Sequence, residues 1–146
     1  MHIEYRKLTL SDLSMVVKMN TDFREGFIRP ENAEAFLTDK RNWLFAAVAD
    51  KQVIGFAYGY ELPRLDRDAP MLYIHEVGVL DVYQRQGIGF ALMTALKATA
   101  RASGICKIFL TTYQNNDAAN ALYRKAGGEV PVESQGNDTV YWFRID

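Results

Sequence analysis

Cysteine and long apolar runs are both scarce in this sequence, and each scarcity narrows the class of protein. Cys106 is the single cysteine among 146 residues, so no internal disulfide can form. No apolar run approaches the roughly 18 residues that a membrane span needs, and residues 1–6 lack the apolar core of a signal peptide. We therefore expect a soluble protein of the reducing cytoplasm.

The sequence also lacks a concentrated block of charge of either sign. The net charge is −1 and the isoelectric point is near 6.1, with acidic and basic residues interspersed. This pattern excludes the basic footprint of a protein that binds nucleic acid or an anionic membrane surface. No repeat or linker divides the chain, and 146 residues suit one domain over residues 1–146.

Apolar patterning predicts that strands and helices alternate. Helices are expected from Leu13, after Pro30, over residues 88–103 and from Asp117 to Ala126. Strand-like runs occupy residues 3–8, 43–49, 53–62, 71–79, 107–112 and 139–145. This order predicts a mixed α/β sheet.

A short segment joins the strand predicted over residues 71–79 to the helix that begins at Ile88. It contains Gly87 and Gly89, which let the backbone turn sharply and come close to a ligand. The first turn of the helix has N–H groups without internal partners, and the positive end of the helix dipole lies there. The segment is therefore predicted to bind a pyrophosphate.

Two widespread phosphate-binding motifs do not fit this segment. An NTPase phosphate loop needs Lys-Ser or Lys-Thr after its glycines, and neither follows here. A dinucleotide fingerprint needs a small residue three positions after Gly89, where this chain has Leu92. The remaining pattern, Gln84-x-x-Gly87-x-Gly89, resembles the acetyl-CoA signature of the GNAT acyltransferase superfamily.

Two further motifs extend the resemblance over essentially the whole chain. The segment from Asn116 to Gly127 is similar to the family's N-x-x-A-x-x-L-Y-x-x-x-G segment, and the strand from Tyr73 to Val79 resembles its bulged fourth strand. The resemblance implies the GNAT fold, an α/β fold with a mixed central sheet of six to seven strands, about four helices and a bulged fourth strand. One departure is Gly128, where the family usually has a large apolar residue.

Within the superfamily, the chain looks most like the class I aminoglycoside 3-N-acetyltransferases. The similarity lies in Glu61-Leu-Pro-Arg, in Tyr73-Ile-His-Glu and in Arg85-Gln-Gly-Ile. It implies an acetyl-CoA-dependent N-acetyltransferase of the antibiotic-resistance type, in which the amine of the substrate attacks directly. Dimers are common among such enzymes, so the resemblance also suggests a homodimer.

The resemblance further implies how coenzyme A binds. The N–H group of Val77 would polarise the thioester carbonyl, and Val79 would pair with the pantetheine arm. The pyrophosphate would lie on the glycine-containing segment, and no metal is expected. The implied cofactor-binding set is Val77, Val79, Gln84, Arg85, Gln86, Gly87, Ile88, Gly89, Phe90 and Asn116.

Glu76 and Tyr123 are the candidate catalytic residues. Acyl transfer needs a neutral amine and a departing thiolate that is stabilised or protonated. Glu76 would take the ammonium proton, or else only position the substrate, and Tyr123 would donate to the sulfur, or else only pack at the rim of the core. His75 is the rival base, but neighbours on a regular strand point to opposite faces, so one of the two should reach the cleft unless a bulge re-aims it.

Acidic residues are the candidates for holding the acceptor. A polycationic aminoglycoside needs carboxylates around the cleft, and Asp22, Glu25, Glu61 and Glu76 lie in segments expected to rim it. Basic residues alternate with them, so a peptide, a polyamine or a small amine metabolite stays open as the acceptor. The motifs are also compatible with a non-catalytic acyl-CoA sensor and with an acyltransferase for longer acyl groups.

Overall fold

The structure, a computed structural model, describes residues 1–23, 28–130 and 138–145. In these residues, six strands form one mixed sheet whose spatial order, β1-β2-β3-β4-β5-β6, follows the order of the chain. Neighbouring strands are antiparallel except β4 and β5, which are parallel. The strands are β1 (Glu4–Lys7), β2 (Asn42–Ala49), β3 (Gln52–Leu62), β4 (Met71–Val79), β5 (Lys107–Tyr113) and β6 (Asp138–Arg144).

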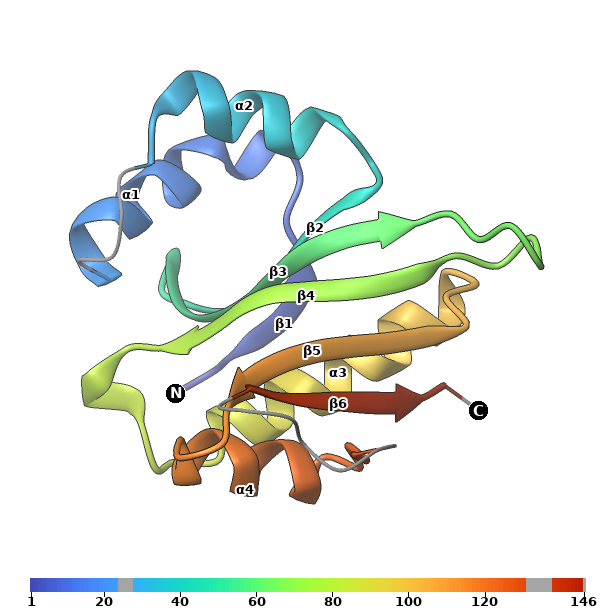
Figure 1. The fold of residues 1–146 in the computed structure, drawn as a ribbon. Coiled ribbons are helices and arrows are strands. Elements are labelled where there is room, and N and C mark those ends of the chain that lie inside the picture. Colours follow the sequence, from blue (N-terminus) through green and yellow to red (C-terminus); the bar gives the residue numbers. More distant parts are fainter. Residues whose placement is uncertain (24–27, 131–137, 146) are drawn as a thin grey trace.

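Helices cover the sheet on both faces (Figure 1). One face carries α1 and α2, which bury Val16 and Ala33 against Leu44 and Phe56. The other face carries α3 and α4 over the larger apolar core, and none of these described helices is long and apolar enough to cross a membrane. The predicted α/β fold is confirmed. The helices are α1 (Leu13–Phe23), α2 (Pro30–Thr38), α3 (Ile88–Ala102) and α4 (Asp117–Lys125), with single 3-10 turns at η1 (Leu10–Asp12) and η2 (Asp81–Tyr83).

Local chemistry sets several of the element boundaries. Asp50 and Lys51 both have positive φ angles, 49° and 61°, which is the geometry of a tight hairpin turn between β2 and β3. The cap of α4 differs from the expected Asp117. Asn116 caps this helix instead, because its Oδ1 accepts a hydrogen bond from the N–H of Ala119 at 3.1 Å.

β4 contains a bulge, as the family resemblance implied. Its register against β3 steps from Tyr58↔Glu76 to Gly59↔Ile74, so His75 is the extra residue. Side chains alternate along a regular strand, and the extra residue interrupts that alternation. Ile74 therefore lies in the core beneath α3, whereas Glu76 lies on the face that α1 and α2 cover.

β4 and β5 separate beyond their first four residue pairs. They pair from Met71↔Lys107 to Ile74↔Leu110, and then β4 continues along β3 while β5 continues along β6. The N–H of Leu80 donates to the carbonyl of Ile54 on β3 at 2.9 Å. Because alternate residues of an antiparallel strand direct their N–H groups to opposite edges, Val77 and Val79 direct theirs away from β3. A gap edged by main-chain donors therefore opens between β4 and β5.

Replacing Gly59, which lies opposite the bulge, should destabilise the protein. A Cβ at this position would lie 1.8 Å from the carbonyl oxygen of Tyr73, so Gly59→Ala must push β4 away from β3. We expect urea unfolding to show a loss of about 3 kcal/mol or more, at the upper end of the cost of overpacking. Gly55→Ala is the matched control on the same strand, because its Cβ would meet neighbours no closer than 3.5 Å. Equal effects of the two substitutions would contradict the steric role of Gly59.

Candidate active site

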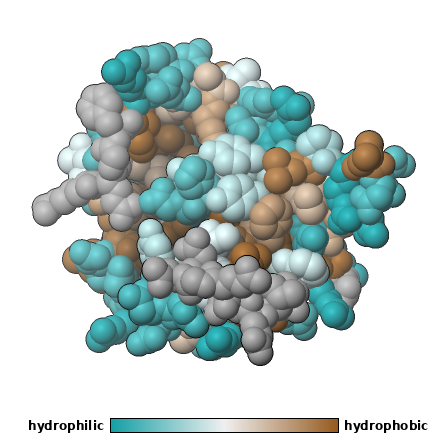
Figure 2. Space-filling view, in the orientation of Figure 1, coloured by the Kyte–Doolittle hydropathy of each residue, from teal (hydrophilic) through white to brown (hydrophobic). Residues whose placement is uncertain are grey.

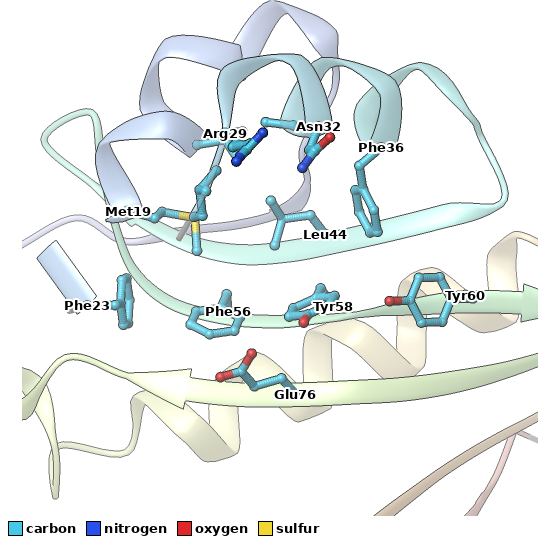
Figure 3. Close-up of a pocket in the computed structure, with 13 residues that line it drawn as sticks. Met19, Phe23, Arg29, Asn32, Phe36, Leu44, Phe56, Tyr58, Tyr60 and Glu76 are labelled. Carbon is cyan, nitrogen blue, oxygen red and sulfur yellow. The ribbon is translucent and has the colours of Figure 1, made fainter. Parts of the chain in front are cut away.

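Two cavities reach β4 from different sides of the sheet. Glu76 lines the first and its neighbour Val77 lines the second, so one short stretch of β4 separates them. The first, here called the α1–α2 cavity, has a volume of about 520 Å³ (Figure 3) and is lined by Val16, Met19, Phe23, Ile28, Arg29, Asn32, Ala33, Phe36, Leu44, Phe56, Tyr58, Tyr60 and Glu76. The second, the α3–α4 cavity, has a volume of about 530 Å³ and is lined by Val77, Gly78, Val79, Tyr83, Gln84, Arg85, Gly87, Ile88, Gly89, Phe90, Asn116, Ala118, Ala119, Ala121, Leu122, Tyr123 and Lys125.

The loop before α3 is held by its own glutamine side chains. Gln84 Nε2 donates to the carbonyl of Val79 at 3.0 Å, and Gln86 Nε2 donates to the carbonyl of Val82 at 3.0 Å. Arg85 adopts a left-handed conformation with a φ of 61°. The two glutamine amide nitrogens thus stabilise the loop itself.

The two glycines at the start of α3 meet different needs. Gly87 has a φ of 79°, and a Cβ built on it would meet nothing within 4 Å, so its surface is open to a ligand. A Cβ on Gly89 would lie 3.2 Å from a methyl group of Leu122, so this glycine lets α3 and α4 come close together. The N–H groups of Ile88 and Phe90, in the first turn of α3, have no acceptor within the helix and line the same cavity. The loop is therefore suited to an anion.

Tyr123 is on the α4 wall of the α3–α4 cavity. Its ring packs against Tyr141 and Phe143 at centroid distances of 5.4 and 6.3 Å, and 6% of its surface is exposed. Burial, and to a smaller degree the nearby Tyr141, raises the pKa of Tyr123 to about 12. The phenol is therefore protonated at neutral pH and can donate a hydrogen bond into the cavity.

Asn120 organises the α4 wall, and the sequence analysis did not single it out. Its Nδ2 donates to the carbonyls of Tyr113 at 3.1 Å and Asn116 at 2.7 Å, and its Oδ1 accepts from the hydroxyl of Tyr141. It thereby ties the end of β5 and the middle of β6 to the start of α4. Its place in the sequence was a usable signal, because it lies one helical turn after Asn116 on the inner side of the helix that carries Tyr123.

Gly128 leaves room for an aromatic residue from another strand. A Cβ at this position would lie 2.8 Å from the ring of Phe143 and 2.8 Å from the carbonyl oxygen of Tyr123. Phe143 on β6 therefore occupies the space beneath the end of α4. This packing accounts for the departure at Gly128 from the family pattern.

Tyr58 holds the Glu76 carboxylate in the α1–α2 cavity. Burial, followed by the negative charge of Glu76 and a hydrogen bond to its side chain, raises the pKa of Tyr58 to about 12. The neutral phenol thus donates to the carboxylate, and both groups lie beneath α1 and α2 (Figure 3). Tyr58 was not predicted from the sequence. A usable signal was present, because Phe56, Tyr58 and Tyr60 alternate on one face of β3.

His75 lies on the same face of the sheet as Glu76. Its ring centroid is 5.2 Å from that of Tyr58, and its Nδ1 lies 3.2 Å from the hydroxyl oxygen of Tyr60. The bulge re-aims one of the two side chains, so the strict alternation expected for a regular strand does not hold here. His75 therefore stays a candidate base beside Glu76.

The acidic rim expected for a polycationic substrate is not assembled in the described residues. Glu61 lies on the opposite face of the sheet, where its Oε2 accepts a hydrogen bond from Trp43 Nε1 at 2.7 Å in the core beneath α3. This placement corrects the expectation that Glu61 rims the cleft. Asp22 is on α1 but is not among the residues that line the cavity, and Glu25 lies outside the described residues. The same residues contain no group of three acidic, histidine or cysteine side chains that could hold a metal.

The site combines a loop suited to an anion, a sheet that splays between β4 and β5, and a carboxylate on the other side of β4. The model of the Acetyltransferase (GNAT) family matches residues 11–128, and the chain belongs to this family. The predicted family is confirmed.

The most informative relatives in sequence are N-alpha-acetyltransferases. The chain is 36% identical to the N-alpha-acetyltransferase RimI of Mycobacterium tuberculosis over 92 residues, which are 62% of this chain and 54% of that protein. It is 28% identical to an N-alpha-acetyltransferase of Sulfurisphaera tokodaii over 134 residues, which are 84% of this chain and 77% of that protein. The chain thus spans about half the length of the mycobacterial relative.

Solved structures share the fold at low sequence identity. An aminoglycoside acetyltransferase from an uncultured soil metagenomic sample, in complex with trehalose, superposes with a TM-score of 0.77 at 23% identity, covering 92% of this chain and 91% of that chain. NAA60 of Arabidopsis thaliana, in complex with acetyl-CoA, gives a TM-score of 0.75 at 19% identity, covering 99% and 100%. At these identities the likeness concerns the fold alone.

Stability should fall at alkaline pH because of Tyr123. Its pKa is 10.0 in an ordinary environment and about 12 in the folded protein. Below pH 10 both states keep the proton, whereas between about pH 10 and 12 the unfolded chain loses it first, so up to about 2.7 kcal/mol of stability disappears. Urea unfolding from pH 9 to 12 should show this fall, and Tyr123→Phe should make it shallower, leaving the part that the raised pKa of Tyr58 contributes. Tyr113→Phe, at a tyrosine that is 64% exposed, should not, and an equal response of both variants would contradict the assignment.

Proposed function

We propose that the chain transfers the acetyl group of acetyl-CoA to the α-amine at the N-terminus of a polypeptide. The observation that carries the proposal is the meeting of two cavities at β4, where Glu76 faces one and Val77 faces the other. An amine that enters beneath α1 and α2 reaches this strand from one side, and a thioester in the β4–β5 gap reaches it from the other. Direct attack of the amine needs no covalent enzyme intermediate in such an arrangement.

The described residues fit coenzyme A. The N–H groups of the first turn of α3, together with the open surface at Gly87, suit a pyrophosphate. The N–H groups of Val77 and Val79 suit a pantetheine arm that lies in the gap like an added strand. When bound, acetyl-CoA supplies the activated acetyl group, and the chain supplies orientation and proton transfer.

Each proposed catalytic group acts on one proton or one developing charge. Glu76 accepts a proton from the substrate ammonium, and Tyr58 keeps its carboxylate in position. The N–H of Val77 donates to the carbonyl oxygen while the amine attacks the carbonyl carbon. Tyr123 donates its phenolic proton to the sulfur as the carbon–sulfur bond breaks, and it is reprotonated by the second proton that the attacking nitrogen loses. The products are the amide and the free thiol.

The α1–α2 cavity favours an amine that has a carbonyl group and an apolar side chain close to it. Its walls are largely aromatic and aliphatic, with Phe36 and Phe56 among them, and its charged lining residues are Arg29 and Glu76. Arg29 and Asn32 lie one helical turn apart on the α2 side of the cavity, across from Glu76 (Figure 3), where their side chains suit a carbonyl oxygen. A peptide N-terminus offers both groups, and the two relatives in sequence are N-alpha-acetyltransferases.

An aminoglycoside is the second candidate acceptor. The resemblance to class I aminoglycoside 3-N-acetyltransferases in the strand around Tyr73 and in the loop at Arg85 favours it. A polycationic ring system would meet one carboxylate, Glu76, and one guanidinium, Arg29, among the described lining residues. Because these two charges cancel, we rank the aminoglycoside below the peptide as the acceptor.

Removing either proposed proton-transfer group should slow transfer without weakening cofactor binding. We expect Glu76→Gln and Tyr123→Phe each to lower kcat by about 10²-fold or more, because general acid or base catalysis contributes roughly this much. Calorimetry should show that both variants still bind acetyl-CoA. Glu61→Gln is the matched control, because Glu61 lies on the opposite face of the sheet.

The same assay separates the two candidate bases. His75→Gln should retain most of the turnover if Glu76 takes the proton. Unchanged turnover in both Glu76→Gln and Tyr123→Phe, or a larger loss in His75→Gln than in Glu76→Gln, would overturn the assignment. If the protein bound acetyl-CoA but released no thiol with any amine, it would instead be a non-catalytic acyl-CoA sensor.

A panel of acceptors should identify a peptide α-amine as the preferred substrate. Thiol release from acetyl-CoA would be measured with short peptides, their N-terminally blocked forms, polyamines and aminoglycosides of the kanamycin and gentamicin types. We expect kcat/KM to be at least about tenfold higher for the free peptides, which corresponds to about 1.4 kcal/mol. If an aminoglycoside gave the higher kcat/KM, the proposed acceptor would be wrong, whereas the proposed acetyl-transfer chemistry would stand. Longer acyl thioesters in the same assay test the breadth of the acyl site.

A further inference from the structure

A row of aromatic side chains leads out of the α1–α2 cavity across the sheet. It consists of Tyr58, Tyr60, His75, Tyr73 and Phe109, which we call the aromatic strip. Ring centroids are 5.2 Å apart for Tyr58 and His75, 6.1 Å for His75 and Tyr73, and 5.2 Å for Tyr73 and Phe109. The strip thus runs from β3 through β4 to β5 without a break.

The far part of the strip lies on a face that no described helix covers. α1 and α2 pack over β2 and β3, whereas α3 and α4 lie behind the sheet (Figure 1). His75 is exposed, Tyr73 and Phe109 are half-buried, and Trp142, paired with Phe109 on β6, is 41% exposed. The middle of this face is mostly white to brown in the space-filling view (Figure 2). Contiguous aromatic side chains that no described helix covers are one feature of a binding site.

We infer that the aromatic strip binds the residues of the acceptor polypeptide that follow its N-terminal residue. The inference rests on the proposed function, because the strip begins at Tyr58 and Tyr60, which line the cavity with Glu76. An acceptor whose amine meets Glu76 leaves the cavity beside His75, and the next part of the molecule then lies on Tyr73 and Phe109. The strip therefore selects acceptors with apolar or aromatic side chains after the first residue.

The dimensions and charge of the strip suit an extended peptide. Three centroid steps of 5.2, 6.1 and 5.2 Å span the strip. An extended chain rises about 3.3 Å per residue, and the steps change direction between strands, so at most about five residues cover the strip. The strip has no carboxylate of its own, and Lys107 at its far end lies over the Trp142 ring at 4.2 Å. A polycationic acceptor would find cation–π contacts on these rings but no carboxylate, and Lys107 would repel it, whereas apolar side chains stack on aromatic rings without that repulsion.

The test is a length series of peptides with one N-terminal residue. We expect KM to fall roughly tenfold from the aminoacyl amide to a peptide of about five residues with apolar side chains, and then to level off, since two ring contacts contribute about this much. Tyr73→Ala and Phe109→Ala should remove this dependence on length, while kcat with the aminoacyl amide stays within about twofold. Tyr73→Phe and Phe109→Tyr keep the rings, so these two variants should retain the dependence of KM on peptide length. Their contrast with the Ala variants shows that the rings, and not a general loss of folding, cause the effect.

Two controls make the outcomes distinct. Leu65→Ala removes a fully exposed apolar side chain from the β3–β4 loop and should leave the length dependence unchanged. Of the two tryptophans, Trp43 is 1% exposed, so quenching of Trp142 fluorescence by the peptides reports binding to the strip without any turnover. Acetylation of peptides with no length dependence, or a benefit from the rings with aminoglycosides alone, would overturn the inference. Quenching without acetyl transfer would instead overturn the proposed function and leave the strip in place.

Discussion

The extra residue in β4 is the constraint on which the rest of the site depends. With a regular strand, Ile74 and Glu76 would share one face, and either a carboxylate would enter the apolar core or an isoleucine would leave it. The bulge at His75 lets both residues occupy suitable surroundings, and Gly59 makes room for it because a side chain there would collide with the backbone of Tyr73. A steric requirement on β3 thus fixes the position of a polar group on β4.

The two sides of β4 rely on neutral donors more than on charged side chains. On the side of the α3–α4 cavity these donors are the main-chain N–H groups at the start of α3 and along the edge of β4, with Tyr123 kept protonated by burial. On the side of the α1–α2 cavity Tyr58 donates to Glu76 and is itself kept protonated. Fixed neutral dipoles in a partly buried site stabilise developing charge without a large cost of desolvation. Such a site suits a reaction in which one reactant loses a proton on one side of β4 while negative charge develops on the other reactant.

The sequence was sufficient for the fold and for placing the two motifs that line the α3–α4 cavity together, and less so for the α1–α2 cavity. The loop at Gly87 and the helix that carries Tyr123 are continuous motifs, so their residues approach one another through local structure. The α1–α2 cavity depends on register and on which face a side chain takes. Glu61 was misplaced because its face depends on pairing with Leu72 opposite, and the contact between Tyr58 and Glu76 appears only once β3 and β4 are aligned. His75 shows the same limit, because a bulge cannot be located from alternation alone.

The order of the strands also bears on how the chain folds. Each strand pairs with the next one along the chain, but short loops join the strands of two pairs, β2–β3 and β3–β4, which therefore cost little chain entropy. Helices separate the strands of the other three pairs, and four residue pairs join the parallel strands β4 and β5. The antiparallel unit of β2, β3 and β4 can therefore form early, and docking of the β5–β6 unit with α4 completes the molecule late. The surface on which coenzyme A is proposed to lie is created in that last step, so binding competence and completion of the native state arrive together.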